Sequence, residues 1–208
     1  MFNQKIFLQE TLERNEFNFS DQQIDQFCHY LNLLKKWNRT YNLTAITDNK
    51  QMVLWHILDS LVVSPFLHGQ RFLDVGTGAG LPGIPLSFAF PEKQFVLLDS
   101  NGKKTRFLSN VVRELQLKNV EVVQARVEAF QTEHCFDSIL ARAFSSLRVI
   151  IESTRHLLCK EGQILAMKGT YPEKEIRDIP EGFKLLTVHS LRIKGLNAER
   201  HLVCMGFE

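Results

Sequence analysis

The sequence lacks the features that mark secreted, membrane-spanning or zinc-binding proteins. It has no CxxC pair that would indicate zinc or redox chemistry. Its first residues contain neither an uninterrupted apolar stretch nor a cleavage site of small residues, so we expect no signal peptide. The most apolar stretch, residues 52–67, is interrupted by His56 and Asp59 and is short for a membrane span. We therefore expect a cytoplasmic protein with no membrane partner and no metal.

The cysteines are few and isolated in the sequence. They are Cys28, Cys135, Cys159 and Cys204. Because cytosolic proteins keep their thiols reduced, we expect all of them to be reduced structural residues.

An excess of charge of one sign is also absent. The 25 Lys and Arg residues nearly balance the 23 Asp and Glu residues, which leaves a formal net charge of +2. A nucleic acid would therefore have to bind a local basic patch rather than a uniformly cationic surface. The length of 208 residues suits one domain with a sizeable core, and we expect a monomer.

The N-terminal third has the pattern of helices. Ser20 and Gln23 form a capping box, and apolar residues follow at helical spacing from Ile24 to Leu34. A second amphipathic helix is expected to begin near Asp48 and to end at Pro65. We expect residues 1–66 to form a helical extension of a domain that comprises residues 67–208.

From residue 71 onward, short apolar runs alternate with amphipathic helices. The runs cover residues 71–75, 94–99, 120–125, 136–141 and 163–168, and the helices cover roughly 83–90, 102–116 and 145–158. This alternation predicts an α/β fold with a mostly parallel sheet and helices on both faces. Two last runs, 183–191 and 200–207, have only a short connection and are expected to pair antiparallel.

The stretch FLDVGTGAGLPGIPL, residues 72–86, follows the first of these runs. Ligands of doubly wound sheets bind at the carboxyl ends of the strands, and glycine lets the main chain approach a ligand closely. The loop lacks the Gly-Lys-Ser/Thr ending of a phosphate-binding Walker loop. Glycines that only shape a turn are the simplest alternative.

Two cofactors fit the glycine pattern. Gly78, Gly80 and Gly83 match the GxGxxG loop of nicotinamide-dependent enzymes, whereas Gly76, Gly78 and Gly80 match the GxGxG loop of S-adenosylmethionine (SAM) methyltransferases. In either case Asp99, at the end of the next apolar run, would bind ribose hydroxyl groups.

The surroundings of the loop favour SAM over a nicotinamide cofactor. The sheet takes up residues 84–208, so no second substrate domain is left for an oxidoreductase. Pro82 and Pro85 remove main-chain donors near the helix start, where a dinucleotide pyrophosphate would use them. The terminal antiparallel pair also resembles the sheet of SAM methyltransferases.

The end of the fourth run limits the chemistry of the methyl acceptor. It has ARAF, Ala141 to Phe144, in place of the Asn/Asp-Pro-Pro-aromatic tetrapeptide of amino-group methylases. No cysteine lies in a Pro-Cys setting that would suggest a covalent pyrimidine mechanism. Guanine N7 remains by elimination, because it attacks a methyl group with its own lone pair and mainly needs positioning.

Basic residues follow the apolar runs at the edge where ligands bind. They are Arg126 after the third run, Arg142 after the fourth, Lys168 after the fifth, and Arg200 with His201 at the start of the last. We interpret them as candidates for contacts with RNA phosphates or bases, and solvated surface charges are the alternative. His56 and Asp59, three residues apart, are interpreted as a structural hydrogen bond or a helix cap.

Several motifs together resemble one known family. In order, they are KWNRTYNLTAITD, HILDS, FLDVGTGAGLPGIPL, LLDSNGKKTRFL, ARVE, RAFSSL, MKG and ERHLV. This series resembles the RsmG (GidB) family of bacterial 16S ribosomal RNA methyltransferases over nearly the whole chain. The resemblance implies a Rossmann-like class I SAM-dependent methyltransferase that modifies N7 of guanine 527 (usual 16S numbering), in 16S rRNA or in the small ribosomal subunit.

The resemblance also implies roles for individual residues. Gly76 and Leu81 would line the SAM site, the Val127 amide and the Glu128 carboxylate would hold the adenine, and Arg142 would lie near the methionine end. Position in the sequence adds Gly78 and Asp99 to this set. Arg126, Lys168, Arg200 and His201 remain the candidates for positioning RNA or guanine. The alternatives are a non-catalytic, SAM-binding ribosome-assembly factor, a nicotinamide oxidoreductase and a small-molecule methyltransferase.

Overall fold

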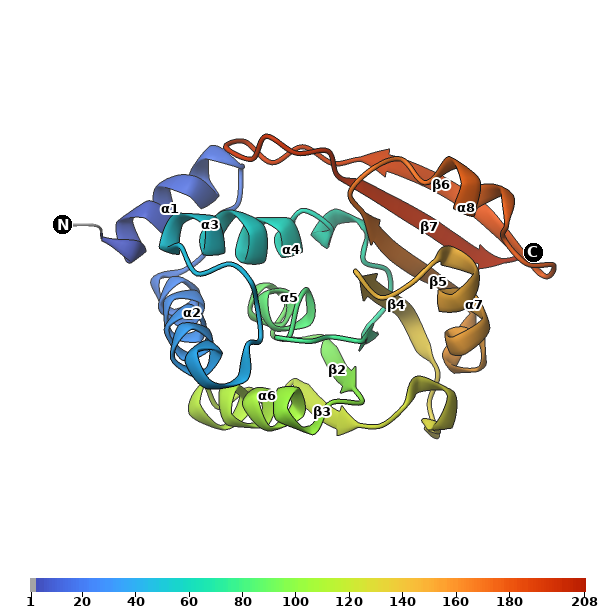
Figure 1. Ribbon diagram of the computed structural model, residues 1–208, viewed down its shortest axis with the longest axis horizontal. Coiled ribbons are helices and arrows are strands. Elements are labelled where there is room, and N and C mark those ends of the chain that lie inside the picture. The colour runs from blue at the N-terminus through green and yellow to red at the C-terminus, as the bar shows by residue number, and fades with distance from the viewer. Residues whose placement is uncertain (1–2) are drawn as a thin grey trace.

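A seven-stranded sheet in the order β3-β2-β1-β4-β5-β7-β6 forms the centre of the computed structural model, which describes residues 3–208 (Figure 1). The strands are β1 Arg71–Val75, β2 Gln94–Asp99, β3 Val120–Gln124, β4 Phe136–Arg142, β5 Leu158–Lys168, β6 Phe183–Ser190 and β7 His201–Phe207. The first five are parallel, and β7 lies antiparallel between β5 and β6. The predicted mostly parallel sheet with an antiparallel C-terminal pair is confirmed.

Helices cover both faces of the sheet, as predicted. The α-helices are α1 Gln4–Arg14, α2 Asp21–Tyr41, α3 Asn49–Met52, α4 Asp59–Leu61, α5 Gly83–Ala89, α6 Gly102–Glu114, α7 Leu147–Thr154 and α8 Glu173–Arg177. Helices α1 to α6 bury their apolar side chains in one cluster with one face of the sheet, and α7 packs in a second cluster on the other face. No helix within residues 3–208 is long and apolar enough to cross a membrane.

The N-terminal helices join the glycine loop directly. The capping box of α2 is confirmed, since the Ser20 amide donates to Gln23 Oε1 at 3.0 Å and the Gln23 amide to Ser20 Oγ at 3.3 Å. Further along α2, the buried Tyr30 hydroxyl donates to the Ala79 carbonyl at 2.9 Å. This contact fixes α2 against the loop that follows β1. The predicted division of the chain at residue 66 stays a prediction.

The second predicted helix is not one regular helix. After α3 the chain forms a π-helical segment, η1 (Val53–Leu58), then α4, and then a 3₁₀ turn at Ser64–Phe66 that contains Pro65. A π-helical turn takes up more residues than an α-helical one, and such turns are frequent at functional sites. Trp55 in η1 and Asp59 at the start of α4 both line a pocket, as described below.

The expectation of four reduced cysteines is wrong for two of them. Cys135 and Cys159 form a disulfide, with Cα atoms 5.0 Å apart, while Cys28 and Cys204 are free. Cys135 directly precedes Phe136 of β4 and Cys159 directly follows its register partner Leu158 of β5, so the pairing of these strands brings the two cysteines near each other. Neighbouring strands thus create a pairing that a separation of 24 residues in the sequence does not indicate.

The strand order places the glycine loop at a ligand-binding position. Strand β1 pairs with β2 on one side and with β4 on the other, so the crossovers reverse direction at β1. Loops at the carboxyl ends of the strands on either side of such a reversal diverge and leave a crevice between them. The site described next lies at this edge of the sheet.

Candidate active site

A first pocket, of about 260 Å³, lies at the carboxyl ends of β1 to β4. Four residues that the sequence assigned to cofactor binding line it: Gly76, Asp99, Val127 and Glu128. Arg126, which the sequence assigned to RNA, lines the same pocket and has no ion-pair partner within residues 3–208.

The main-chain conformation at position 76 and the surroundings of this position both require glycine. Its φ of +64° lies in the left-handed region, which costs other residues about 1–2 kcal/mol. A Cβ at this position would lie 2.4 Å from Cδ2 of Phe144, far inside contact distance. The bare main chain therefore leaves just enough room for the Phe144 ring at the wall of the first pocket. Phe144 is a site residue that sequence reasoning did not single out.

Asp99 is held as a fixed carboxylate in the first pocket. Its oxygens accept hydrogen bonds from the Gly78 amide at 3.0 Å and the Asn101 amide at 2.9 Å, and Lys104 Nζ lies at 3.3 Å. Only 6% of the residue is exposed. Gly78, predicted to bind the cofactor, does not itself line the pocket, but it orients the carboxylate that does.

Asp74 is a buried acid that sequence reasoning did not use. Its Oδ2 accepts from Thr77 Oγ1 at 2.6 Å and from the Gly83 amide at 2.8 Å, whereas its Oδ1 has no partner in the described chain. Burial raises the pKa of Asp74 to about 7. The side chain therefore ties the two ends of the glycine loop together, and the signal for it was its position two residues before Gly76.

A second pocket, of about 360 Å³, adjoins the first. Its charged and aromatic lining residues are Trp55, Asp59, Arg142, Lys168 and Arg200. Ala143 lines both pockets and has a φ of +50°, a strained value for a residue with a Cβ. This turn in the main chain directs Arg142 to the second pocket and Phe144 to the first.

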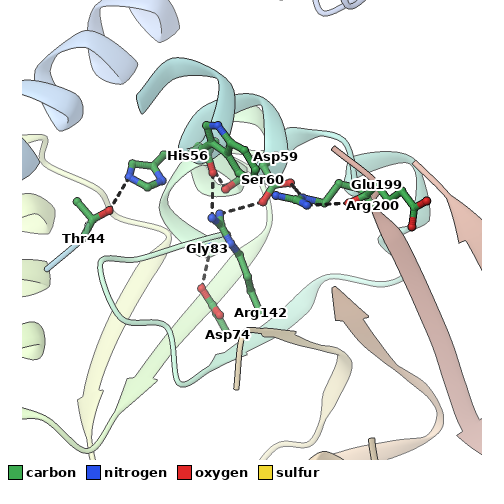
Figure 2. Close-up of polar contacts among 10 residues, drawn as sticks. Thr44, His56, Asp59, Ser60, Asp74, Gly83, Arg142, Glu199 and Arg200 are labelled. Carbon is green, nitrogen blue, oxygen red and sulfur yellow. Dashed lines mark hydrogen bonds and ion pairs between the residues drawn. The ribbon is translucent and has the colours of Figure 1, made fainter. Parts of the chain in front are cut away.

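Asp59 connects the two arginines of the second pocket. Its Oδ1 accepts from Arg200 Nε at 2.6 Å, and its Oδ2 lies 3.3 Å from Arg142 Nη1. Arg142 Nη2 also donates to the Trp55 carbonyl at 2.9 Å. Figure 2 shows Arg142 and Arg200 approaching Asp59 from two sides. The side chain of Asp59 is 3% exposed, so both guanidinium groups are fixed against a buried carboxylate.

His56 has a structural position next to this network. Its Nε2 lies 3.0 Å from Thr44 Oγ1, and its carbonyl accepts from the Ser60 hydroxyl (Figure 2). Burial, and then the charge of Arg142, lower the pKa of His56 to about 4, so the ring is neutral at physiological pH. These contacts fit the structural role that the sequence suggested for His56. Asp59, in contrast, is more than a helix cap, because it bridges Arg142 and Arg200.

The remaining predicted residues lie close to the pockets. Lys168 lines the second pocket, with its ammonium held by the Ser145 carbonyl and the Glu175 carboxylate, both at 2.8 Å. His201 pairs with Lys168 across β5 and β7 and lies 3.2 Å from the Gly169 carbonyl. Leu81 is buried in the glycine loop and lines neither pocket. Arg142 lines the second pocket rather than the first, and the cofactor roles of these two residues stay predictions.

The described residues contain no group of three or more His, Cys, Asp or Glu side chains arranged to hold a metal ion. The polar groups that do converge are guanidinium, ammonium and carboxylate side chains together with main-chain amides. This chemistry suits an organic ligand with hydroxyl groups in the first pocket and an anionic or electron-rich ligand in the second.

Comparison with known families identifies the chain. The family described as rRNA small subunit methyltransferase G (GidB) matches residues 23–203. The chain belongs to this family. It is 48% identical over 196 residues to the ribosomal RNA small subunit methyltransferase G of Enterobacter sp. (strain 638), covering 94% of this chain and 95% of that protein. It is 50% identical over 186 residues to the protein of that name from Escherichia coli (strain K12 / DH10B), covering 89% and 90%.

Solved structures of more distant proteins share the methyltransferase G fold. The glycopeptide N-methyltransferase MtfA in complex with SAM superposes with a TM-score of 0.62 at 12% identity, covering 74% of this chain and 96% of that chain. A coclaurine N-methyltransferase superposes with a TM-score of 0.61 at 10% identity, covering 98% of this chain and 94% of that chain. The fold is therefore the Rossmann-like fold of class I methyltransferases.

Proposed function

We propose that this protein transfers a methyl group from SAM to N7 of a guanine in 16S rRNA of the small ribosomal subunit, at position 527 in the usual numbering. Family membership supports a methyltransferase that acts on small-subunit rRNA. The choice of N7 rests on one observation in particular. The second pocket is lined by three cations and one carboxylate, and that carboxylate is already bound by two arginines.

The residues of the first pocket fit SAM. The Asp99 carboxylate, fixed by two main-chain amides, would accept hydrogen bonds from the ribose hydroxyls. Val127 and Glu128 begin a short 3₁₀ helix, η3 (Val127–Ala129), where the first N–H groups lack partners within the helix and are free to bind the adenine. The main chain of Gly76, which lines the first pocket, would lie against the methionine part. When bound, SAM supplies an electrophilic methyl group.

The second pocket offers no free general base to the acceptor. Asp59 is neutralised by Arg142 and Arg200, and Glu175, behind Lys168, accepts from Lys168 and from the Leu147 amide. Methylation of a hydroxyl or an amine requires loss of a proton, which a positioned base would accept. Guanine N7 has a lone pair and no proton, so cations that bind the neighbouring O6 or a phosphate are sufficient.

Catalysis then depends on positioning. The strained Ala143 lies between the pockets, so an acceptor in the second pocket approaches whatever is bound in the first across a single residue. Fixed guanidinium groups hold the acceptor without rearrangement during the reaction. The product guanine carries a positive charge on its imidazole ring, and the cationic lining favours its release.

The test is methyl transfer from labelled SAM to 16S rRNA and to small ribosomal subunits, followed by strand cleavage specific for N7-methylguanine. The proposal predicts one new N7-methylguanine, at the proposed position. SAM binding without incorporation into either substrate would instead support a non-catalytic assembly factor. Binding of a nicotinamide cofactor in preference to SAM would support an oxidoreductase.

A further inference from the structure

The Arg200 guanidinium lies over the Trp55 ring in the lining of the second pocket. The guanidinium carbon of Arg200 lies 4.5 Å from the centre of the Trp55 ring, and both residues line the pocket. We propose that this pair is the stacking platform for the acceptor purine, and that Asp59 is the positioning residue that holds it in place. The identity of the acceptor rests on the proposed function, but the existence of the platform does not.

The chemistry of the pair matches that of a nucleobase. Unpaired bases in RNA stack on aromatic rings and on guanidinium planes, and such stacking contributes about 1–3 kcal/mol per base. A guanidinium held over an indole by a cation–π contact is a flat, delocalised cation at the pocket wall. A lysine in place of Arg200 would keep the charge but not this plane.

The Arg200 guanidinium is fixed on two of its three nitrogens. Its Nε donates to Asp59 at 2.6 Å and its Nη1 to the Glu199 carbonyl at 2.7 Å (Figure 2). Its Nη2 has no hydrogen-bond partner within residues 3–208, and Arg142 Nη1 also lacks a well-aligned acceptor although Asp59 Oδ2 lies 3.3 Å away. Arg200 Nη2 is therefore the donor available to an acceptor atom of the ligand, whereas Arg142 Nη1 is buried and faces Asp59.

Asp59 sets the orientation of both groups from the opposite side of the site. It begins α4, four residues after Trp55, whereas Arg142 ends β4 and Arg200 precedes β7. Without its charge, two largely buried guanidinium groups would repel each other, and each would keep only its hydrogen bond to a main-chain carbonyl. The indole and the carboxylate thus belong to one turn of helix that orders the platform.

Tryptophan fluorescence tests the platform directly, because the chain has only two tryptophans. The Trp37 ring stacks on the Tyr41 ring, with the ring centres 5.3 Å apart, and its centre lies 5.7 Å from that of Phe107. Trp37 lines neither pocket. A Trp37→Phe variant therefore reports on Trp55 alone. In protein saturated with S-adenosylhomocysteine, added guanosine monophosphate should quench this fluorescence saturably.

The matched control is the Trp55→Phe variant, which keeps Trp37. It corrects for light absorbed by the nucleotide and should show no saturable change. Equal quenching in both variants, or none in the protein that retains Trp55, would overturn the platform.

Substitutions at Arg200 and Asp59 test how the platform is held. Arg200→Lys and Asp59→Asn should each weaken the binding of guanosine monophosphate about tenfold, the loss of roughly one stacking interaction. Both should raise the KM for the rRNA substrate by a similar factor and leave the KM for SAM within about twofold. Arg192→Lys, at an exposed position in the connection between β6 and β7, should change neither the affinity for guanosine monophosphate nor the KM for rRNA.

The outcomes separate the platform from the proposed function. Nucleotide affinity unchanged in Arg200→Lys would overturn the platform even if Asp59→Asn does not fold. Quenching of Trp55 that depends on Arg200, in a protein that does not methylate rRNA, would support the platform and reject the proposed function.

Discussion

The first pocket is lined by segments at the carboxyl ends of four parallel strands, whereas the second joins charged side chains from the N-terminal helices, the sheet and the C-terminal connection. Around the first pocket, Gly76 and Gly78 follow β1 and Asp99 ends the neighbouring β2. Around the second, Asp59 comes from the N-terminal helices, Arg142 ends β4 in the middle of the sheet, and Arg200 lies in the connection before β7. In the proposed function, the first arrangement would serve a cofactor of constant shape and the second a particular acceptor.

The largest expected effect comes from removing one arginine of the second pocket. Arg142→Ala should lower kcat/KM for rRNA about 100-fold, because truncating one partner of a buried charge pair costs about 2–5 kcal/mol. The dissociation constant of SAM should change less than about threefold, since Arg142 does not line the first pocket. Isothermal titration with SAM and steady-state transfer measure the two quantities.

The control for Arg142→Ala is Arg148→Ala, which breaks an exposed ion pair with Asp178 and should leave transfer unchanged. Equal losses of SAM affinity and activity in Arg142→Ala would place this residue at the cofactor instead, as the family resemblance implies.

Gly76→Ala is expected to weaken SAM binding in the first pocket, by a smaller factor than Arg142→Ala lowers kcat/KM. The added Cβ would displace Phe144 from the pocket wall, so SAM affinity should fall at least about tenfold, which corresponds to about 1.4 kcal/mol. Gly78→Ala is a matched control, because Gly78 has nearly the same φ, +61°, and its nearest contact would lie at 3.9 Å.

Phe144→Ala in the Gly76→Ala background should recover part of the lost affinity by removing the clash. If Gly78→Ala weakens SAM as much as Gly76→Ala does, strain in the main chain rather than the Phe144 contact controls the pocket.

A pH-dependent effect on stability is expected from Asp74 under the glycine loop. Burial raises its pKa to about 7, so between about pH 4 and pH 7 the folded protein retains a proton that the unfolded chain has released. This group's contribution to the free energy of unfolding therefore falls as the pH rises through that window. Asp74→Asn lacks this loss, so its stability relative to the wild type should rise with pH.

Urea unfolding of both proteins from pH 4.5 to pH 7.5 measures this difference. His56, with its pKa lowered to about 4, contributes the opposite slope below pH 6.5, but it is present in both proteins and cancels. A difference in stability that is constant across the window would contradict a raised pKa of Asp74.

The smallest effect is expected far from both pockets. Ser20→Ala removes the capping box of α2 and should lower the free energy of unfolding by about 1 kcal/mol. Methyl transfer at a temperature well below the unfolding transition should not change. A loss of transfer in this folded variant would show that the N-terminal helices affect the site by more than packing.

The comparison between the pockets also explains what the sequence could predict. The strands, the capping box and the glycine loop follow local periodicity and spacing, and the sequence predicted them, although β5 begins at Leu158 rather than at the predicted residue 163. Gly76 and Asp99 were found from the glycine spacing and from their places at the ends of apolar runs, whereas Val127 and Glu128 were implied by the family resemblance.

Contacts between distant segments were harder to predict. No spacing rule connects Asp59 with Arg142 and Arg200, and none connects Cys135 with Cys159. Trp55 lies in an apolar helical stretch, where an aromatic residue is expected to be part of the core. Its role depends on a π-helical turn and on a partner at residue 200.

The most direct test of the account replaces one atom of the acceptor. Small-subunit rRNA in which only the target guanine carries C–H in place of N7 keeps O6, the base plane and the phosphates that the second pocket would bind. The account predicts that this substrate accepts no methyl group and competes with unmodified rRNA with an inhibition constant close to the KM. Methyl transfer to the substituted guanine at an undiminished rate would contradict N7 as the acceptor.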